Sequence, residues 1–308
     1  MVTDLAGDPD ELFLPEDLSA DLLTKLTQPR ADICGLSMDR PRIMGILNVT
    51  PDSFSDGGDH DDLSDAIARA QDLSRHADII DIGGESTRPG AKTVDTKEEI
   101  QRTAPVIHAI RNAGITTPIS IDTRKADVAQ AALDAGADMI NDVSALSFDP
   151  EIGRVAARAD VPICLMHAQG DPATMQKNPY YSNVVTDVYD YLGARINAAL
   201  EMGIKPERII TDPGIGFGKT VQHNLNLLRH LSLYHALGCP ILLGASRKRF
   251  IGTLSQTPDA KDRMPGSVAV ALFAARQGAQ ILRVHDITET RQALTLELAI
   301  NADKNEDE

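Results

Sequence analysis

The sequence predicts a single (β/α)8 barrel, in which eight parallel strands alternate with helices. Eight short apolar runs follow one another along the chain, amphipathic stretches separate them, and each run ends in polar residues. The runs are too continuous for strands with one face in water, so they fit parallel strands that are covered on both faces. About 260 residues for eight such units is close to the usual length of this barrel.

The apolar runs begin at residue 43 and recur as far as residue 286. In order they are IMGILNV (43–49), ADIIDIGG (77–84), PISIDT (118–123), MINDVSA (139–145), PICLMH (162–167), RIITDPG (208–214), PILLGAS (240–246) and ILRVHD (281–286). Helical patterns lie between them, among others at 63–76, 97–113, 125–135 and 221–237. Thr96 and Glu99 form a capping-box signature ahead of the second helix, and Gly114 and Gly136 stand where glycine usually ends a helix.

An open, doubly wound sheet alternates strands and helices in the same way and is the alternative fold. The count of eight and the even composition favour the barrel. We therefore expect one barrel domain at 33–303, an acidic extension at 1–32 and an acidic tail at 304–308. The extension is expected to form a partly helical arm, and ICGLSM (33–38) a small hairpin that closes the lower end of the barrel.

The composition excludes several classes of protein. The formal net charge of −15 argues against a general binder of nucleic acid or anionic membranes. No apolar segment approaches the roughly 20 residues of a membrane span, and the first residues lack the basic and apolar regions of an export signal. Three widely spaced cysteines without a CxxC pair indicate reduced thiols, so a cytoplasmic location is expected.

The polar ends of the eight runs predict a shared ligand site, because the carboxyl ends of barrel strands meet at the mouth where active sites lie. The stretch NVTPDSFSDGG (48–58) crowds hydrogen-bonding groups directly after the first run. The other run ends carry Gly84 and Glu85, Asp122, Asn141 and Asp142, Met166 and His167, Asp212, Ser246 to Lys248, and Arg283 with His285 and Asp286.

Two glycine- or histidine-containing motifs do not carry the chemistry that they first suggest. In GIGFGKT (214–220), Pro213 stands where a P-loop requires glycine, and the glycine spacing is not G-x-G-x-x-G. Lys219 is expected near the first turn of a helix. HAQGDP (167–172) has no partner at metal-ligand spacing, which disfavours a zinc site, and no nucleophile elbow of the G-x-S-x-G type is present.

The remaining polar residues suggest a ligand with an anionic part and a planar ring. Arg283 and His285 alternate along the last strand, so both point to one side, and with Asn48 they suit an anion. Asp122, Asn141 and Asp212 suit the donors of an amino-pyrimidine edge, because buried carboxylates require donors. Lys248 can serve the ring carbonyl or nitrogens, although an internal ion pair between Asp212 and Lys248 is the structural alternative.

Taken in order, these segments resemble the dihydropteroate synthase family. The matching segments are GILNVTPDSFSDGG, DIGGESTRPGA, SIDTRK, INDVSA, MHAQGDPATMQ, DPGIGFGK, SRKRFIG and RVHD, from about residue 42 to the last helix. The resemblance implies a (β/α)8 barrel and a transferase that condenses 6-hydroxymethyl-7,8-dihydropterin pyrophosphate with p-aminobenzoate to 7,8-dihydropteroate and pyrophosphate in folate biosynthesis, with Mg2+ assisting. It also implies a homodimer formed through the last helices.

The family's site residues carry over onto matching positions. The family's pterin pocket corresponds to Asp122, Asn141, Met166, Asp212 and Lys248. Its pyrophosphate site corresponds to Asn48, Thr87, Arg283 and His285, and Asn48 is also expected at the metal. The region that receives p-aminobenzoate corresponds to Phe54, Arg88, Pro89, Gly216, Phe217 and Ser246. Lys248, Arg283, His285 and Asp122 are the expected catalytic residues, and Asp52 is a further candidate near the metal or the cationic intermediate.

The expected chemistry requires charge stabilisation more than a protein nucleophile. Early C–O cleavage leaves positive charge on the pterin and negative charge on pyrophosphate, without a covalent enzyme intermediate. Loops at 48–62 and 85–96 are expected to exclude water, the first as a lid hinged at Gly57 and Gly58. Two rival functions are a pterin-dependent methyltransferase and a degenerate pterin-binding module. The first does not need the anion-binding residues, and the second would have lost them.

Overall fold

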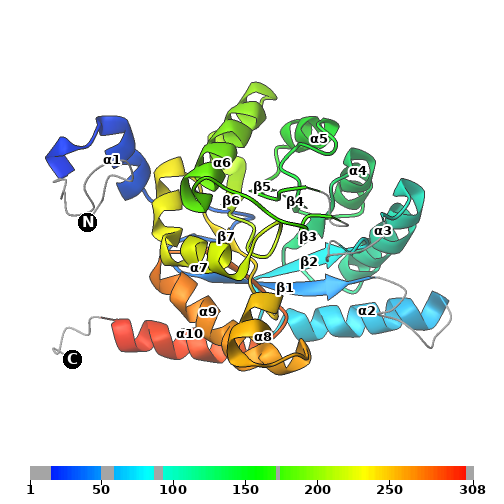
Figure 1. Ribbon diagram of the computed structural model, residues 1–308. Helices are drawn as coiled ribbons and strands as arrows, with labels where there is room; N and C mark the ends of the chain where they lie inside the picture. Colours follow the sequence, from blue (N-terminus) through cyan, green and yellow to red (C-terminus); the bar gives the residue numbers. More distant parts are fainter. Residues whose placement is uncertain (1–14, 50–58, 87–92, 171–173, 303–308) are drawn as a thin grey trace, which may run out of the picture.

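The strands form a parallel barrel at the centre of the protein. A computed structural model describes residues 15–49, 59–86, 93–170 and 174–302, and Figure 1 shows the strands surrounded by helices. The sheet order is β6-β5-β4-β3-β2-β1-β8-β7, and a parallel bridge between Thr211 and Ile241 joins the two edge strands. The strands are β1 (Arg42–Asn48), β2 (Ile79–Gly83), β3 (Ile119–Asp122), β4 (Met139–Asp142), β5 (Ile163–Met166), β6 (Ile209–Asp212), β7 (Leu242–Leu243) and β8 (Ile281–Val284). The predicted barrel is confirmed.

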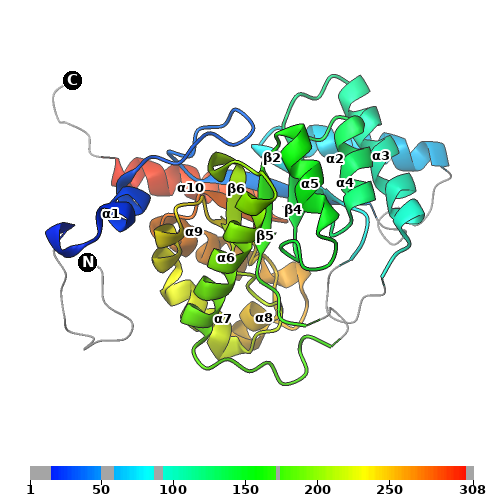
Figure 2. The same ribbon diagram turned by 90° about the horizontal axis from the view of Figure 1, so that it is seen from above.

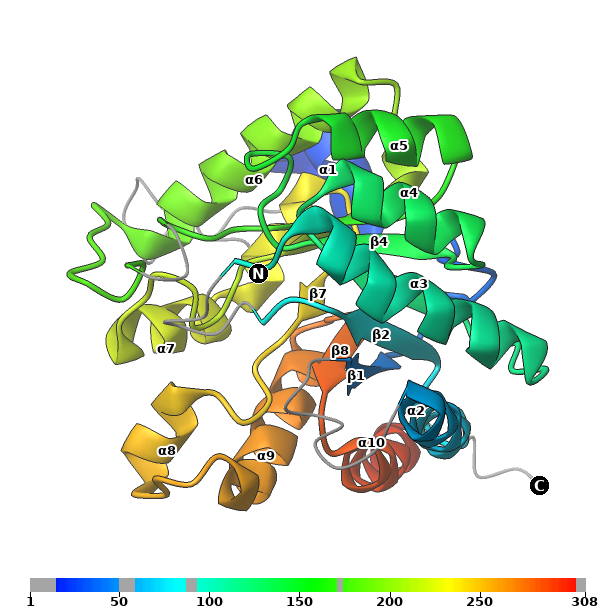
Figure 3. The same ribbon diagram turned by 90° about the vertical axis from the view of Figure 1, so that its right-hand side faces the viewer.

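Helices cover the outer face of the barrel. Figure 3 shows α3, α4 and α5 side by side along one flank. Outward-facing strand residues such as Ile80, Ile82 and Ile121 are fully buried beneath this layer. The helices are α1 (Ala20–Thr27), α2 (Asp59–Leu73), α3 (Thr96–Asn112), α4 (Ala126–Asp134), α5 (Glu151–Ala159), α6 (Val184–Glu201), α7 (Val221–Arg229), α8 (Arg249–Ser255), α9 (Met264–Arg276) and α10 (Ile287–Asn301), with short 3-10 helices η1 (Pro15–Asp17), η3 (Pro206–Arg208), η4 (Leu231–Leu237) and η5 (Lys261–Arg263).

The inside of the barrel is apolar at its lower end and polar at its upper end. The lower cluster contains Ile33, Met38, Met44, Ile79, Met139, Cys164, Ile210, Leu242 and Ile281. Ile33 forms an antiparallel bridge with Leu36, so the expected hairpin at 33–38 is present and plugs this end. Because side chains alternate along a strand, the inward-facing residues two positions further on, Asp81, Asn141, Asp212 and Arg283 among them, form the polar upper layer.

Several predicted element limits are wrong. The helix expected at 221–237 ends at Arg229, and η4 continues the segment. The strand expected at 240–246 is regular only at Leu242–Leu243. The two predicted C-terminal glycines are confirmed, because Gly114 and Gly136 have φ of 80° and 109°.

The predicted capping box is also wrong. Asp95 is the N-cap, and its carboxylate accepts a hydrogen bond from the backbone N–H of Lys97 at 2.9 Å. Glu99 is only 1% exposed and accepts hydrogen bonds from Thr123 and Lys125. Its carboxylate is therefore recruited by tertiary contacts that a local pattern does not encode.

The N-terminal segment packs against the barrel through α1, which contacts η4. Arg30 donates hydrogen bonds to the carbonyl oxygens of Gly238 and His235, at 3.1 and 2.9 Å. Figures 1 and 2 place α1 and the end of α10 on the same side of the molecule. The domain limits at 32 and 303 stay predictions, and residues 1–14 and 303–308 lie outside the described part. Among the described helices, none is long and apolar enough to cross a membrane.

Candidate active site

Arg283 links the polar residues inside the upper barrel. Its Nε lies 2.6 Å from Oδ2 of Asp81, and its Nη2 lies 2.7 Å from Oδ2 of Asp122. Burial acts to lower the pKa of Arg283, but the two carboxylates outweigh it and raise the pKa. The side chain from β8 thus joins β2 and β3, and the predicted convergence of Asp122 with Arg283 is found.

Asp122 presents an oxygen without an internal partner. Its Oδ1 is buried and accepts no hydrogen bond from the described residues. Burial, reinforced by Asp81 and opposed by Arg283, raises the pKa of Asp122 to about 7. A buried acceptor without a partner is costly and rare. This oxygen is therefore ready for a donor supplied by a ligand.

Asn48 and Asp212 border the same region. A Cβ added at Gly83 would lie 3.8 Å from Oδ2 of Asp122 and 3.9 Å from Oδ1 of Asn48, so these side chains flank Gly83. A Cβ added at Gly244 would lie 3.8 Å both from Oδ2 of Asp212 and from Cδ of Arg283. The two glycines keep the space between these polar groups free of side chains.

Asn141 and Asp212 are both buried among these charges. The amide Nδ2 of Asn141 lies 3.4 Å from Oδ2 of Asp81. Oδ1 of Asp212 accepts the backbone N–H of Gly214 at 2.7 Å, and burial raises the pKa of Asp212, against the opposing charge of Lys248. Met166 pairs in register with Asp212 and is 3% exposed. The four predicted strand residues of the pterin pocket therefore gather inside one end of the barrel.

Lys248 contacts the glycine-rich loop rather than forming the predicted alternative ion pair. Within the described residues no ion pair joins its ammonium to Asp212; Nζ donates to the carbonyl of Ile215 and lies 4.3 Å from the centroid of the Phe217 ring. Gly216 permits this approach, since a Cβ there would meet Cδ of Lys248 at 3.0 Å. Burial lowers the pKa of Lys248 to about 8, although Asp212 acts to raise it.

Ser246 and His285 contact each other at the end of the last strand. Oγ of Ser246 lies 3.1 Å from Nδ1 of His285 and accepts the His285 backbone N–H at 3.2 Å. Arg247, which precedes Lys248, is instead paired with Asp286. His285, which is predicted to bind the pyrophosphate, is thus held in place by Ser246, which is predicted to contact p-aminobenzoate.

Some predicted site residues lie outside the described part of the chain. These are Asp52, Phe54, Gly57, Gly58, Thr87, Arg88 and Pro89, so their roles and the lid at 48–62 stay predictions.

Sequence reasoning missed Asp81, which is fully buried and holds Arg283. Asp81 lies inside the run ADIIDIGG rather than at its polar end, so the pattern of polar strand ends did not indicate it. The available signal was the carboxylate itself, since a charge within a two-sided buried strand requires a partner.

A buried ion cluster at the start of the segment after β2 was also missed. Glu85 accepts hydrogen bonds from Arg124, from Nζ of Lys125 at 2.7 Å and from the backbone N–H of Val94 at 2.9 Å. Lys125 also donates to Glu99 and to the carbonyl of Val94. Glu85 and Val94 are thereby tied together, which fixes both ends of the segment containing the predicted residues Thr87 to Pro89.

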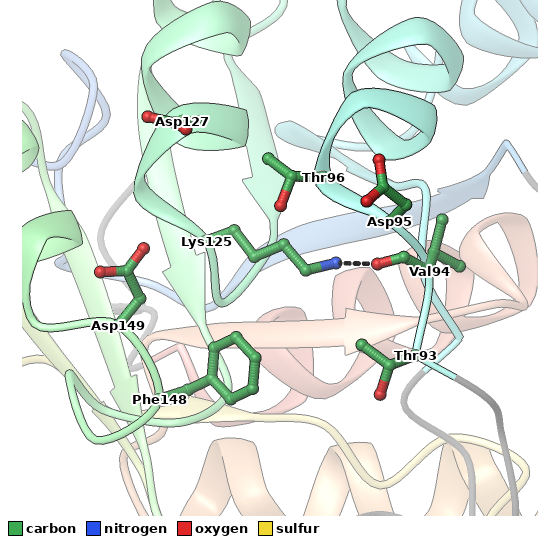
Figure 4. Close-up of a pocket in the computed structure, with 8 residues that line it drawn as sticks. All are labelled: Thr93, Val94, Asp95, Thr96, Lys125, Asp127, Phe148 and Asp149. Atoms are coloured by element: carbon green, nitrogen blue, oxygen red, sulfur yellow. Dashed lines mark hydrogen bonds between the residues drawn. The ribbon is translucent and has the colours of Figure 1, made fainter.

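A surface cavity of about 620 Å³ lies beside this cluster, as Figure 4 shows. Its lining residues are Thr93, Val94, Asp95, Thr96, Lys125, Asp127, Phe148 and Asp149. None of these is a predicted substrate residue. Asp95 and Asp149 accept backbone N–H groups at the starts of α3 and of α4 and α5, so their carboxylates are already used.

Comparison with known proteins agrees with this geometry. The family model described as pterin binding enzyme matches residues 44–285. A dihydropteroate synthase of Synechocystis is 50% identical over 254 residues, covering 82% of this chain and 88% of that protein. The chain belongs to the dihydropteroate synthase family.

Solved structures of this family share the barrel. A Xanthomonas albilineans dihydropteroate synthase with 4-aminobenzoic acid is 48% identical, with a TM-score of 0.83, covering 90% of this chain and 99% of that one. A second structure of the X. albilineans dihydropteroate synthase, in complex with 7,8-dihydropteroate, has a TM-score of 0.79 and 44% identity over 89% of this chain and 99% of that one.

Proposed function

We propose that this member of the dihydropteroate synthase family condenses 6-hydroxymethyl-7,8-dihydropterin pyrophosphate with p-aminobenzoate, giving 7,8-dihydropteroate and pyrophosphate. The observation that carries the proposal is the contact of Arg283 with Asp122 in the upper barrel, next to Asp212. One end of the barrel therefore holds both acceptors for a pterin and a cation for a departing diphosphate. The X. albilineans dihydropteroate synthase is seen with 4-aminobenzoic acid and with 7,8-dihydropteroate, which supports the same second substrate and the same product here.

The pterin is expected to bind along its amino-pyrimidine edge. Oδ1 of Asp122, which has no partner among the described residues, accepts a ring or amino N–H of the pterin, and Asp212 accepts another. Asn141 adds an amide, Lys248 donates to the ring carbonyl or nitrogens, and Met166 supplies an apolar wall. Each buried carboxylate thereby gains the donor that its burial requires.

Cleavage of the C–O bond leaves positive charge on the pterin and negative charge on the pyrophosphate, and the site has groups of opposite charge for each. Electrons move to the bridging oxygen of the pyrophosphate, and the methylene carbon and pterin ring become cationic. Asp122 and Asp212 stabilise the cation. Arg283, oriented by its two carboxylates, and His285 stabilise the departing oxygens. Because the guanidinium is held before the reaction, little reorganisation is required during bond cleavage.

The arylamine then attacks the methylene carbon. We place p-aminobenzoate against Gly216, Phe217 and Ser246, where the Phe217 ring lies under the ammonium of Lys248. The new C–N bond forms as the amine nitrogen supplies its electron pair, and the nitrogen then loses a proton. No step requires a protein nucleophile.

The residues present fit a Mg2+ ion held mainly by substrate. Asn48 ends β1, and its Oδ1 lies beside Gly83, as does Oδ2 of Asp122. Among the residues that the structure describes, no cluster of His, Cys, Asp or Glu could hold a metal alone. Mg2+ typically uses one or two protein oxygens together with phosphate and water. Asn48 would contribute one oxygen, and the bound ion supplies positive charge to the diphosphate.

We propose that the protein forms a homodimer through α9 and α10 in the cytoplasm. Leu296 and Ile300, one turn apart on α10, are 59% and 78% exposed, and Phe273 on α9 is 41% exposed, although all three are large and apolar. The Arg276–Glu297 ion pair joins the two helices and holds this face in place. Clustered exposed apolar residues commonly mark protein interfaces. The free cysteines suit a reducing compartment.

The decisive experiment supplies the purified protein with the pterin pyrophosphate, p-aminobenzoate and Mg2+. We expect pyrophosphate release that depends on the arylamine and matches the 7,8-dihydropteroate formed. Equal release without the arylamine would indicate hydrolysis instead. Pterin binding without release would identify a degenerate binding module, and a methyltransferase would leave both substrates unchanged.

A further inference from the structure

Lys219 is a buried amine that the proposed mechanism does not use, and burial lowers its pKa well below the usual value, although Asp212 acts to raise it. It is 3% exposed and lies just before the N-cap of α7, near the first turn of the helix as predicted. Nζ lies 2.8 Å from Nδ1 of His167, 3.4 Å from the His167 carbonyl oxygen and 3.0 Å from the Phe217 carbonyl oxygen. Nζ of Lys219 thus lies within hydrogen-bonding distance of three polar atoms.

His167 is prepared to accept the hydrogen bond at Nδ1. Burial and the neighbouring Lys219 lower the pKa of His167 to about 2, so the ring stays neutral. The rings of Tyr181 and Tyr191 pack around it at 5.9 and 4.8 Å between centroids. The imidazole is therefore a fixed anchor at the end of β5.

The loop at 214–218 lies between this anchor and Lys248. Gly214, with φ of 68°, approaches so closely that an added Cβ would lie 1.8 Å from the carbonyl oxygen of His167. Gly218, with φ of 63°, is similarly close, since its Cβ would lie 2.5 Å from the carbonyl oxygen of Gln169. On the opposite side, Lys248 contacts Ile215 and the Phe217 ring. Close packing of this kind leaves few alternative positions for the loop.

We propose that Lys219, anchored on His167, is a positioning residue that sets the shape of the loop at 214–218 for the arylamine. The inference rests on the proposed function, in which Gly216 and Phe217 contact p-aminobenzoate. Lys219 touches neither substrate, and it acts through its bond to the Phe217 carbonyl. The pterin contacts from Asp122 and Asn141 belong to strands and stay in place when the loop shifts, whereas Asp212 and Lys248 touch the loop through Gly214 and Ile215.

The first test measures the loop without any substrate. Hydrogen exchange of the free protein is followed by mass spectrometry in wild type, Lys219→Met and the control Lys205→Met, whose lysine is exposed and pairs with Asp160. We expect faster exchange over 214–218 in Lys219→Met alone. Unchanged exchange in that variant overturns the proposal. This result does not depend on the enzyme's activity, so it separates failure of the inference from failure of the proposed function.

The second test separates the two substrates. Lys219→Met is expected to raise KM for p-aminobenzoate about tenfold or more, while the Kd of 6-hydroxymethylpterin, measured by calorimetry, rises by a smaller factor. An equal weakening of both overturns the assignment, because it indicates general damage to the barrel.

Variants of His167 test the same Lys219–His167 hydrogen bond by changing its other partner. They replace Lys219→Met if that variant does not fold. His167→Asn keeps an acceptor near the position of Nδ1, and His167→Leu removes it. We expect KM for p-aminobenzoate to rise more in His167→Leu than in His167→Asn. Equal KM values in the two variants contradict a role for the hydrogen bond to Lys219.

Discussion

At the scale of single residues, Asp122 must carry a negative charge and Lys248 a positive charge for the proposed reaction. Asp122 must be ionised to stabilise the pterin cation, and burial raises its pKa to about 7. Lys248 must keep its proton to donate to the ring, and burial lowers its pKa to about 8. Acidic solution therefore neutralises the first group, and alkaline solution neutralises the second.

We predict a bell-shaped pH profile of kcat/KM for the pterin pyrophosphate, falling below about pH 7 and above about pH 8. Asp122→Asn should remove the acidic limb of the residual activity, and Lys248→Met the alkaline limb. The profile is measured under saturating p-aminobenzoate. A limb that persists in its matching variant belongs to the substrate or to another residue and contradicts the assignment.

Removal of the Arg283 side chain tests stabilisation of the leaving group. Arg283→Ala should lower kcat by about 10²–10³, the usual effect of losing one preorganised donor, while 6-hydroxymethylpterin still binds. Arg154→Ala is the control, because this arginine is exposed and pairs with Glu151 on the surface of α5. Steady-state kinetics and calorimetric titration measure the two effects. Unchanged turnover in Arg283→Ala would refute the role of this cation.

At the scale of elements, the ion cluster joins the end of β2 to the starts of α3 and α4. Lys125 is shared between Glu85 and Glu99, and both carboxylates are buried. Removing one partner of a buried ion pair leaves an uncompensated charge, which is strongly destabilising. The three elements are therefore coupled through one ammonium group.

We predict that Lys125→Met lowers the free energy of unfolding by about 3–5 kcal/mol. Lys205→Met is the matched control and should change it by less than about 1 kcal/mol, as expected of an exposed ion pair. Urea unfolding followed by circular dichroism measures both. A Lys125→Met variant as stable as the control would show that the cluster does not hold these elements together.

At the scale of the whole molecule, the exposed face of α9 and α10 determines the oligomeric state that we propose. Leu296→Glu combined with Ile300→Glu should convert the dimer to a monomer, because each places a charge in an apolar interface. Leu254→Glu on α8 is the control, since Leu254 is also 55% exposed but lies outside this face. Sedimentation velocity measures the mass. A wild-type monomer, or a double variant that remains dimeric, contradicts the proposal.

The sequence predicted the barrel well because two-sided burial of parallel strands requires continuous apolar runs. It also predicted Asn141, Met166 and Asp212 in the upper layer, because these residues follow the apolar positions of their strands at the mouth of the barrel. It failed at Glu99, whose local pattern indicates a helix cap. The buried Lys125 attracts this carboxylate more strongly than an exposed backbone N–H does.

The sequence by itself determined the positions of the strands, their burial on both faces and the chemical types of the residues at the mouth of the barrel. These follow from hydrophobic periodicity, which is local. Only the tertiary structure decided the partners: Asp81 with Arg283 across the barrel, and Lys219 with His167 between neighbouring loops. A buried charge takes the nearest complementary group in space, and strand closure determines which group that is, whatever its distance along the chain.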